Sequence, residues 1–203
     1  MAGKHHIRSL AKILTRLQEE RLQGAVILWA DWSNTVDQST NVPSLEVLVD
    51  RHGIMTARCV DGTEDVVITM LLGREACIKK PNFSLSLNGP ADPVLTAGEP
   101  INVTAEAIAE FVTAVGDNNK IHQNDRPIIP GLLLMEYLLD RRPEDANALS
   151  MRFKHPAVAG NIRIDGSKNK IIQNGRCTTT YRWIEDRCGL HSTEKGAQIA
   201  IIS

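Results

Sequence analysis

The stretch VGDNNKIHQNDRPIIPGLLLMEYLL, from Val115 to Leu139, carries most of the information about the fold. Its Pro130-Gly131 pair is typical of a turn, and the residues from 132 to 139 that follow are strongly apolar. A helix that is apolar on all sides is buried rather than set on a surface. The stretch therefore predicts a central, buried helix that begins at the Pro-Gly turn.

The polar residues of the same stretch are suited to acid-base chemistry. The first N–H groups of a helix have no partner inside it and lie at the positive end of the helix dipole, so the Gly131 N–H is a candidate donor to a carbonyl oxygen. Asp117 and His122 flank a turn-forming segment, so both side chains can face one pocket. Glu136 lies on the helix itself, where an ionised carboxylate is costly unless it is paired.

These residues also carry a resemblance to known families. The motif GDNNKIH, preceded by a helical pattern over 105–115, resembles the GDxNPxH signature of MaoC-like (R)-specific enoyl-CoA hydratases, with Lys120 where proline is usual. From His122 through RPIIPG (126–131) to Glu136, the chain is similar to the HFPGxPxxPGxLxxE block of 3-hydroxyacyl-ACP dehydratases, although the HFPG form is absent. Both families have the hotdog fold, in which a long antiparallel sheet wraps a central helix. The resemblance covers roughly residues 93–203 and implies an α+β hotdog fold.

The resemblance implies roles for individual side chains. The first signature pairs His122 with Asp117, and the second pairs it with Glu136; the denser GDxNxIH match favours Asp117. The Gly131 N–H is expected to hold the substrate carbonyl oxygen. Substrate-binding roles are expected for Asn119, Pro130 and Arg126.

The implied activity is that of an acyl-thioester dehydratase or hydratase, which interconverts (3R)-hydroxyacyl and trans-2-enoyl thioesters in fatty acid or polyketide-type metabolism. The substrate is an acyl-CoA or an acyl-ACP thioester, and neither a metal nor another cofactor is required. A thioesterase on the same scaffold and a non-catalytic hotdog subunit of a larger complex are the alternatives. Hotdog sheets commonly pair edge to edge, so the resemblance also implies a homodimer or a higher oligomer.

Residues 1–90 carry no recognised family signature and are expected to form an N-terminal α/β extension, with the hotdog domain in residues 91–203. The pattern of 1–90 predicts an amphipathic helix over 4–22, a buried strand over 25–30, a short helix over 45–50 and a hairpin over 54–72. The extension is interpreted as a degenerate partner domain, a docking element or extra strands on the hotdog sheet. The linker is expected at 88–93.

The second half of the chain predicts helices followed by consecutive strands. Thr104 is placed to cap a helix over 105–115, and Gly116 is placed to end it. Strands are expected at 150–155, 161–165, 170–173, 176–185 and 198–202. Helices followed by strands with tight turns indicate an antiparallel sheet and an α+β layout.

Composition narrows the class of protein. The chain has 203 residues, 42% of them hydrophobic, which is enough for one good core. A net charge of −1 and an aromatic content of 4% argue against binding to nucleic acid or to an anionic membrane surface. The four cysteines form no CxxC motif, and no apolar segment approaches the roughly 20 residues of a membrane span. We therefore expect a cytoplasmic protein with reduced thiols and without a metal site.

Overall fold

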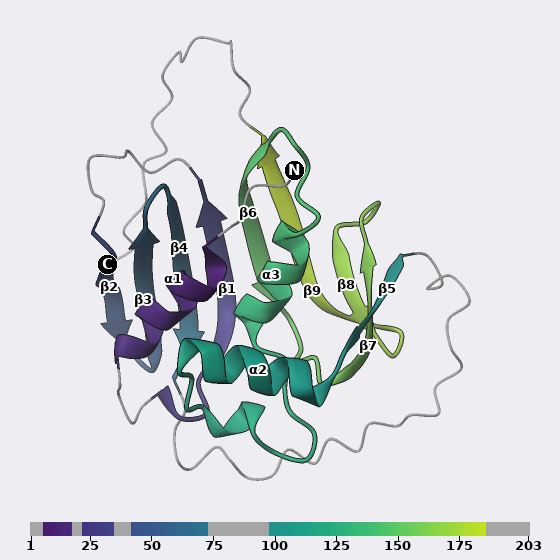
Figure 1. Ribbon diagram of the computed structural model, residues 1–203, viewed down its shortest axis with the longest axis horizontal. Coiled ribbons are helices and arrows are strands. Elements are labelled where there is room, and N and C mark those ends of the chain that lie inside the picture. Colours follow the sequence, from purple (N-terminus) through teal and green to yellow (C-terminus); the bar gives the residue numbers. More distant parts are fainter. Residues whose placement is uncertain (1–5, 18–21, 35–41, 73–97, 186–203) are drawn as a thin grey trace.

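A computed structural model of the chain describes residues 6–17, 22–34, 42–72 and 98–185. Within these residues one antiparallel sheet of nine strands has the order β2-β3-β4-β1-β6-β9-β8-β7-β5. The helices α1 (Ile7–Leu14), α2 (Ala105–Val115) and α3 (Gly131–Leu139) lie against one face of this sheet (Figure 1). The α+β hotdog class, a long antiparallel sheet around a buried helix, is confirmed.

Most strands were predicted within a few residues, but the strand expected to be buried over 25–30 exposes Val26 and Trp29. Two single 3-10 turns, η1 (Thr15–Leu17) and η5 (Lys120–His122), complete the elements used below. The strands are β1 (Val26–Ser33), β2 (Ser44–Arg51), β3 (Ile54–Asp61), β4 (Glu64–Leu71), β5 (Glu99–Val103), β6 (Ala146–Phe153), β7 (Gly160–Asp165), β8 (Lys170–Gln173) and β9 (Arg176–Glu185).

The ends of the helices form as their capping residues predict. The Ala107 N–H donates to Thr104 Oγ1 (3.1 Å) at the start of α2, and Gly116 ends this helix with a left-handed φ of 74°. Glycine adopts this conformation without the steric penalty of a Cβ atom. Helix α3 begins at Gly131, directly after the buried Pro130, as predicted. These local signals fix where the chain turns on either side of the segment 116–130.

The helix expected over residues 45–50 is wrong, because this segment is the edge strand β2. It pairs with β3 from the Ser44–Val60 pair to the Arg51–Ile54 pair. His52 and Gly53, which follow this segment, have φ values of 54° and 76° and close a two-residue hairpin. Positive φ at both central residues is typical of the tight turns that join paired strands. Pairing with β3 therefore outweighs the weak helical pattern.

The sheet consists of two halves with the same strand order. Strands β2-β3-β4-β1 form the first half and β7-β8-β9-β6 the second, each read from the outer edge inward. Helix α1 precedes β1 in the first half, and α3 precedes β6 in the second. The inner strands β1 and β6 pair from Trp29–Arg152 to Ser33–Ala148 and join the halves. The second half has an additional outer strand, β5, against β7.

Residues 26–71 thus contribute four strands to the same sheet as residues 98–185. The predicted boundary between residues 90 and 91, the linker at 88–93 and the strand at 198–202 lie outside the described residues.

One hydrophobic core spans both halves of the sheet. The buried side chains come from all three helices and from the inner face of the strands, so the halves share their apolar contacts. The largest fully buried members include Ile7, Leu10, Trp32, Met55, Phe111, Leu138 and Met151. The site segment 116–130 is therefore anchored to a core to which both halves contribute.

Candidate functional site

Asp117 is held by the end of α2. The Asp117 N–H donates to Val112 O (3.0 Å), which continues the helix-capping turn after Gly116. Its carboxylate oxygen Oδ1 accepts the Asn119 N–H (2.8 Å). An aspartate that binds the main chain two residues further on forms a tight turn. The second oxygen, Oδ2, is left facing His122.

His122 ends the short turn η5 and is held by one ring nitrogen. Its Nδ1 lies 2.6 Å from Ile128 O, and its Nε2 lies 3.6 Å from Asp117 Oδ2. Because a carbonyl oxygen only accepts hydrogen bonds, Nδ1 is the nitrogen that carries the proton in the neutral ring. The lone pair of Nε2 then faces the carboxylate. The His122 side chain is 8% exposed and that of Asp117 is 27% exposed, so the pair is sheltered but reachable.

Burial lowers the pKa of His122 below its ordinary value of 6.5, because a charged imidazolium loses hydration there. The Ile128 carbonyl and the Asp117 carboxylate act in the opposite direction, and burial outweighs them. The ring is therefore neutral at pH 7, with a nitrogen able to accept a proton.

The gap between His122 and Asp117 is suited to a small polar group. A separation of 3.6 Å between Nε2 and Oδ2 is too long for a strong direct hydrogen bond. Two acceptors at this separation can share one water, which donates a hydrogen to each of them, or one substrate hydroxyl, which donates its single hydrogen to one of them. The pair is therefore arranged to hold an oxygen nucleophile or a leaving hydroxyl.

Asn119, predicted to bind substrate, connects the site segment to the start of β1. Its Oδ1 accepts the N–H groups of Gly24 (2.9 Å) and Ile121 (3.4 Å), and its Nδ2 donates to Ala25 O (3.0 Å). Both polar atoms of this amide are thus engaged by the protein's own main chain. The contacts indicate that Asn119 orients the segment between Asp117 and His122.

The start of α3 has no side-chain cap. Pro130 O accepts the N–H groups of Leu133 (3.0 Å) and Leu134 (3.1 Å). The Gly131 N–H has no partner inside the helix, because Gly131 is its first residue. A Cβ atom at Gly131 would lie 3.0 Å from Phe153 Cζ and 3.1 Å from Ile27 Cδ1. Side chains of β1 and β6, one from each half of the sheet, therefore pack closely on the start of this helix.

Glu136 is paired with the N-terminal helix. Its Oε1 accepts Arg8 Nε (2.7 Å), and Arg8 also donates to Glu110 Oε1 (3.1 Å). The Glu136 Oε2 atom is buried without a hydrogen-bond partner. Among the described residues no hydrogen bond or ion pair joins Glu136 to His122. The structure thus brings Asp117 to His122 and Glu136 to Arg8.

Two further predicted residues lie at the margins of the site. Pro130 is buried and sets the direction in which α3 begins. The Arg126 side chain is exposed, and its N–H donates to Asn124 Oδ1 (3.0 Å).

Sequence reasoning missed Ile27, Phe153 and Arg8. Ile27 and Phe153 pack on the start of α3, and Arg8 pairs with Glu136. These contacts form only because distant segments meet in the fold; Arg8 and Glu136 are 128 positions apart in the sequence.

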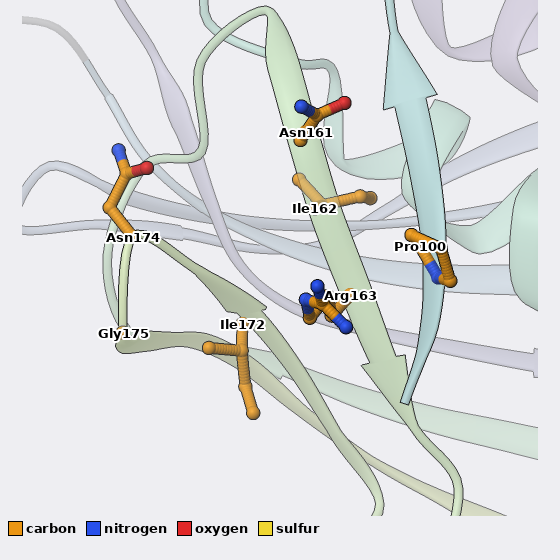
Figure 2. A pocket seen from close by; sticks show the side chains of 7 residues that line it. All are labelled: Pro100, Asn161, Ile162, Arg163, Ile172, Asn174 and Gly175. Atoms are coloured by element: carbon orange, nitrogen blue, oxygen red, sulfur yellow. The ribbon is translucent and has the colours of Figure 1, made fainter. Parts of the chain in front are cut away.

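The hollow shown in Figure 2 lies away from this site. It has a volume of about 350 Å³ and opens between β5, β7 and the turn that joins β8 to β9. Its lining residues are Pro100, Asn161, Ile162, Arg163, Ile172, Asn174 and Gly175. None of them belongs to the segment 115–139, so this hollow is separate from the acid-base pair.

The part of the chain that the structure describes has neither a metal-binding cluster nor a membrane-spanning helix. No group of three or more His, Cys, Asp and Glu side chains is arranged to hold a metal ion there. None of the helices described is both long enough and apolar enough to cross a membrane.

Comparison with known proteins finds similarity only at the level of structure. No family model and no curated protein sequence matches the chain. A MaoC-like dehydratase from Phytophthora capsici superposes with a TM-score of 0.48 at 12% identity, covering 84% of this chain and 74% of that one. The peroxisomal multifunctional enzyme type 2 from Drosophila melanogaster gives 0.44 at 15% identity, covering 86% of this chain and 40% of that one. An acyl-ACP thioesterase from Bacteroides thetaiotaomicron gives 0.44 at 10% identity, covering 79% and 75%.

Proposed function

We propose that the chain is an acyl-thioester hydratase or dehydratase that interconverts trans-2-enoyl and (3R)-hydroxyacyl thioesters. The observation that carries this proposal is the sheltered Asp117–His122 pair, in which Nε2 and Oδ2 lie 3.6 Å apart with the opposite ring nitrogen held by Ile128 O. This arrangement suits a water molecule or a hydroxyl between two acceptors. The motif that contains both residues also resembles the signature of MaoC-like hydratases.

In the hydration direction, one water donates hydrogens to His122 Nε2 and to Asp117 Oδ2. Its oxygen attacks Cβ of the enoyl thioester while the electron pair of the double bond moves toward the thioester oxygen. The proton that the water loses passes to the acid-base pair, and a proton is returned to Cα. The product is a 3-hydroxyacyl thioester. Dehydration is the reverse, in which the pair removes the Cα proton and the hydroxyl leaves as water.

The start of α3 supports the same chemistry. Negative charge develops on the thioester oxygen when the Cα–H bond is made or broken. The Gly131 N–H has no partner inside the helix and lies at the positive end of its dipole, so it is suited to hold this oxygen. One such donor contributes on the order of 3 kcal/mol in comparable oxyanion holes. Ile128, which anchors the His122 ring, belongs to the segment that leads directly into this helix.

The test is the hydration of crotonyl-CoA and of a longer enoyl-CoA. The rate is measured as the loss of enoyl absorbance. His122→Asn is expected to lower turnover at least a hundredfold, because general acid-base groups contribute about 10²–10⁴ in rate. The asparagine amide can keep the hydrogen bond to Ile128 O, so the fold should be retained. The matched control is His52→Asn in the exposed β2–β3 turn, where asparagine tolerates the positive φ. Unchanged turnover in His122→Asn would refute the assignment.

The same assay separates the alternative activities. Release of free thiol from a saturated acyl-CoA, without hydration of enoyl-CoA, would identify a thioesterase. Inactivity on every CoA and ACP thioester until a partner is added would identify a non-catalytic subunit. The carrier, the cytoplasmic location and the division into residues 1–90 and 91–203 stay predictions from the sequence.

A further inference from the structure

The segment that carries the acid-base pair is attached to both halves of the sheet. Asn119, in this segment, binds the Gly24 N–H (2.9 Å) and the Ala25 carbonyl oxygen (3.0 Å), which lie directly before β1 of the first half. The Ile129 N–H donates to Ala157 O (2.8 Å), shortly after β6 of the second half. The candidate site is therefore fixed next to the start of β1 and the end of β6.

One apolar side chain from each of these strand ends covers the start of α3. A Cβ atom built at Gly131 would lie 3.0 Å from Phe153 Cζ and 3.1 Å from Ile27 Cδ1. Ile27 is the second residue of β1, and Phe153 is the last residue of β6. Both side chains pack against the core and are partly exposed. Two half-buried apolar groups thus lie beside the amide that is suited to hold a thioester oxygen.

The region behind Phe153 is filled by the core. Phe153 pairs with Thr179 of β9, and opposite residues of antiparallel strands lie on one face of the sheet. Thr179 and its β8 partner Ile171 are 0% exposed, as is Met151, which lies on the same face of β6 as Phe153. Because buried side chains pack to the density of organic crystals, an additional alkyl chain fits there only if a side chain is displaced or shortened.

We propose that Phe153, with Ile27 beside it, closes the acyl-binding end of the site and restricts it to short-chain substrates such as crotonyl and butyryl thioesters. This inference rests on the proposed function, because it takes the Gly131 N–H as the group that holds the thioester oxygen. The sulfur arm of the substrate carries polar amides and extends toward solvent, whereas the apolar acyl tail packs on apolar side chains. The tail therefore meets Phe153 and Ile27, and the ring of Phe153 limits its length.

An open slot and a closed slot differ in how affinity changes with chain length. An open apolar slot gains about fourfold in affinity for each additional methylene that it removes from water. A slot that ends at an aromatic ring either rejects the longer chain or leaves its end in water, so this gain is lost. We therefore expect wild-type protein to bind octanoyl-CoA no more tightly than butyryl-CoA.

The test is isothermal titration calorimetry with butyryl-CoA and octanoyl-CoA, two saturated thioesters that a hydratase does not turn over. Their phosphopantetheine arm is common to CoA and ACP, so the comparison does not depend on the carrier. Phe153→Ala removes the ring and is expected to tighten the binding of octanoyl-CoA by about tenfold or more, while butyryl-CoA changes by less than about threefold.

Two further variants guard against a loss of the fold. Phe153→Leu leaves a smaller cavity in the core than Phe153→Ala, and it is expected to tighten octanoyl-CoA by about threefold or more. The matched control is Trp183→Leu, which shortens another partly buried aromatic side chain of the same sheet. Trp183 pairs with Leu149 of β6 rather than with Phe153, so its shortening should leave the octanoyl-to-butyryl affinity ratio unchanged.

The proposal would be overturned by a wild type whose affinity already rises with each methylene, or by binding of neither thioester. An affinity ratio that stays unchanged in both Phe153 variants would also overturn it. Failure of this proposal can be told apart from failure of the proposed function. Hydration of crotonyl-CoA that requires His122, with an unchanged ratio, would contradict only the limit set by Phe153. The expected shift in the ratio, in a protein that does not hydrate enoyl-CoA, would contradict only the hydratase assignment.

Discussion

His122 combines a fixed tautomer with a buried ring, and this combination makes the stability of the protein depend on pH. Burial lowers the pKa of His122, so below about pH 6.5 the unfolded chain binds more protons than the folded chain. The stabilisation from the neutral ring is fully present above the unfolded-state pKa of about 6.5. It is lost as the pH falls through the folded-state pKa, with a slope of at most about 1.4 kcal/mol per pH unit.

The variant His122→Asn removes this titration. The free energy of unfolding of the variant, relative to wild type, is expected to rise as the pH is lowered from about 7.5 to about 5.5. Urea denaturation followed by circular dichroism at several pH values measures the difference. A difference that stays constant over this range would contradict the burial of a neutral His122.

Asn119 shows how one amide can hold the segment that carries the candidate site. It makes three hydrogen bonds to the main chain, of which the bonds to Gly24 and Ala25 connect segments about 95 positions apart. Replacing Asn119 with Ala leaves buried main-chain groups without partners, at a cost of about 1–3 kcal/mol. The free energy of unfolding should fall by that amount, and turnover should fall with it because the segment that carries Asp117 and His122 is no longer held against Gly24 and Ala25. Asn118→Ala, in an exposed neighbour, is the control and should change little.

Helix α3 is closely packed at its start. Gly131→Ala introduces a methyl group about 3.0–3.2 Å from Phe153 and Ile27, closer than ordinary contact. Overpacking of this kind typically costs about 1–3 kcal/mol. We expect that loss in the free energy of unfolding, and partial recovery in Gly131→Ala with Phe153→Leu, because the smaller side chain makes room. The control is Gly166→Ala, where an added Cβ meets nothing within 4 Å. A stability equal to wild type would contradict the close packing.

Helix α1 illustrates how an element acquires its role from its contacts. Its apolar face, with Ile7 and Leu10, enters the shared core, while Arg8 reaches the carboxylate of Glu136 on α3. Arg8 and Glu136 hold each other in position, because moving one away would leave the other charge unpaired and partly removed from water. The N-terminal helix therefore helps to fix the position of α3.

The sheet as a whole predicts cooperative unfolding. β1 and β6 form a continuous ladder between the halves, and the core contains side chains from both. Domains that share a sheet and a core unfold together. We expect one transition in denaturant: in variants that keep only Trp32 of β1 or only Trp183 of β9, the other tryptophans being replaced with Phe, fluorescence and circular dichroism should give the same midpoint. Two separate midpoints would contradict the shared core and favour independent halves.

Most of the fold could be predicted from residues that are close in sequence. The cap at Thr104, the left-handed glycine at 116 and the Pro-Gly turn at 130–131 act through contacts within about four residues, so they predict where helices begin and end. The hairpin over 54–72 was predicted for the same reason. β2 could not be, because its extended conformation depends on pairing along the whole length of β3 rather than on its own propensity.

The candidate site was likewise predictable in part from local sequence patterns and in part only from the fold. The sequence alone was enough to select Asp117, His122, Glu136 and Gly131 as candidates, because the motif and the apolar helix are local patterns. The sequence favoured Asp117 over Glu136 as the carboxylate that faces the imidazole but did not decide between them. In the fold Arg8, 128 positions away, pairs with Glu136, while Asp117 lies toward His122. Such choices depend on where distant segments return to one another, which no short pattern of side chains encodes. The approach of Ile27 and Phe153 to Gly131 has the same origin, since it depends on the pairing of β1 with β6 across the two halves of the sheet.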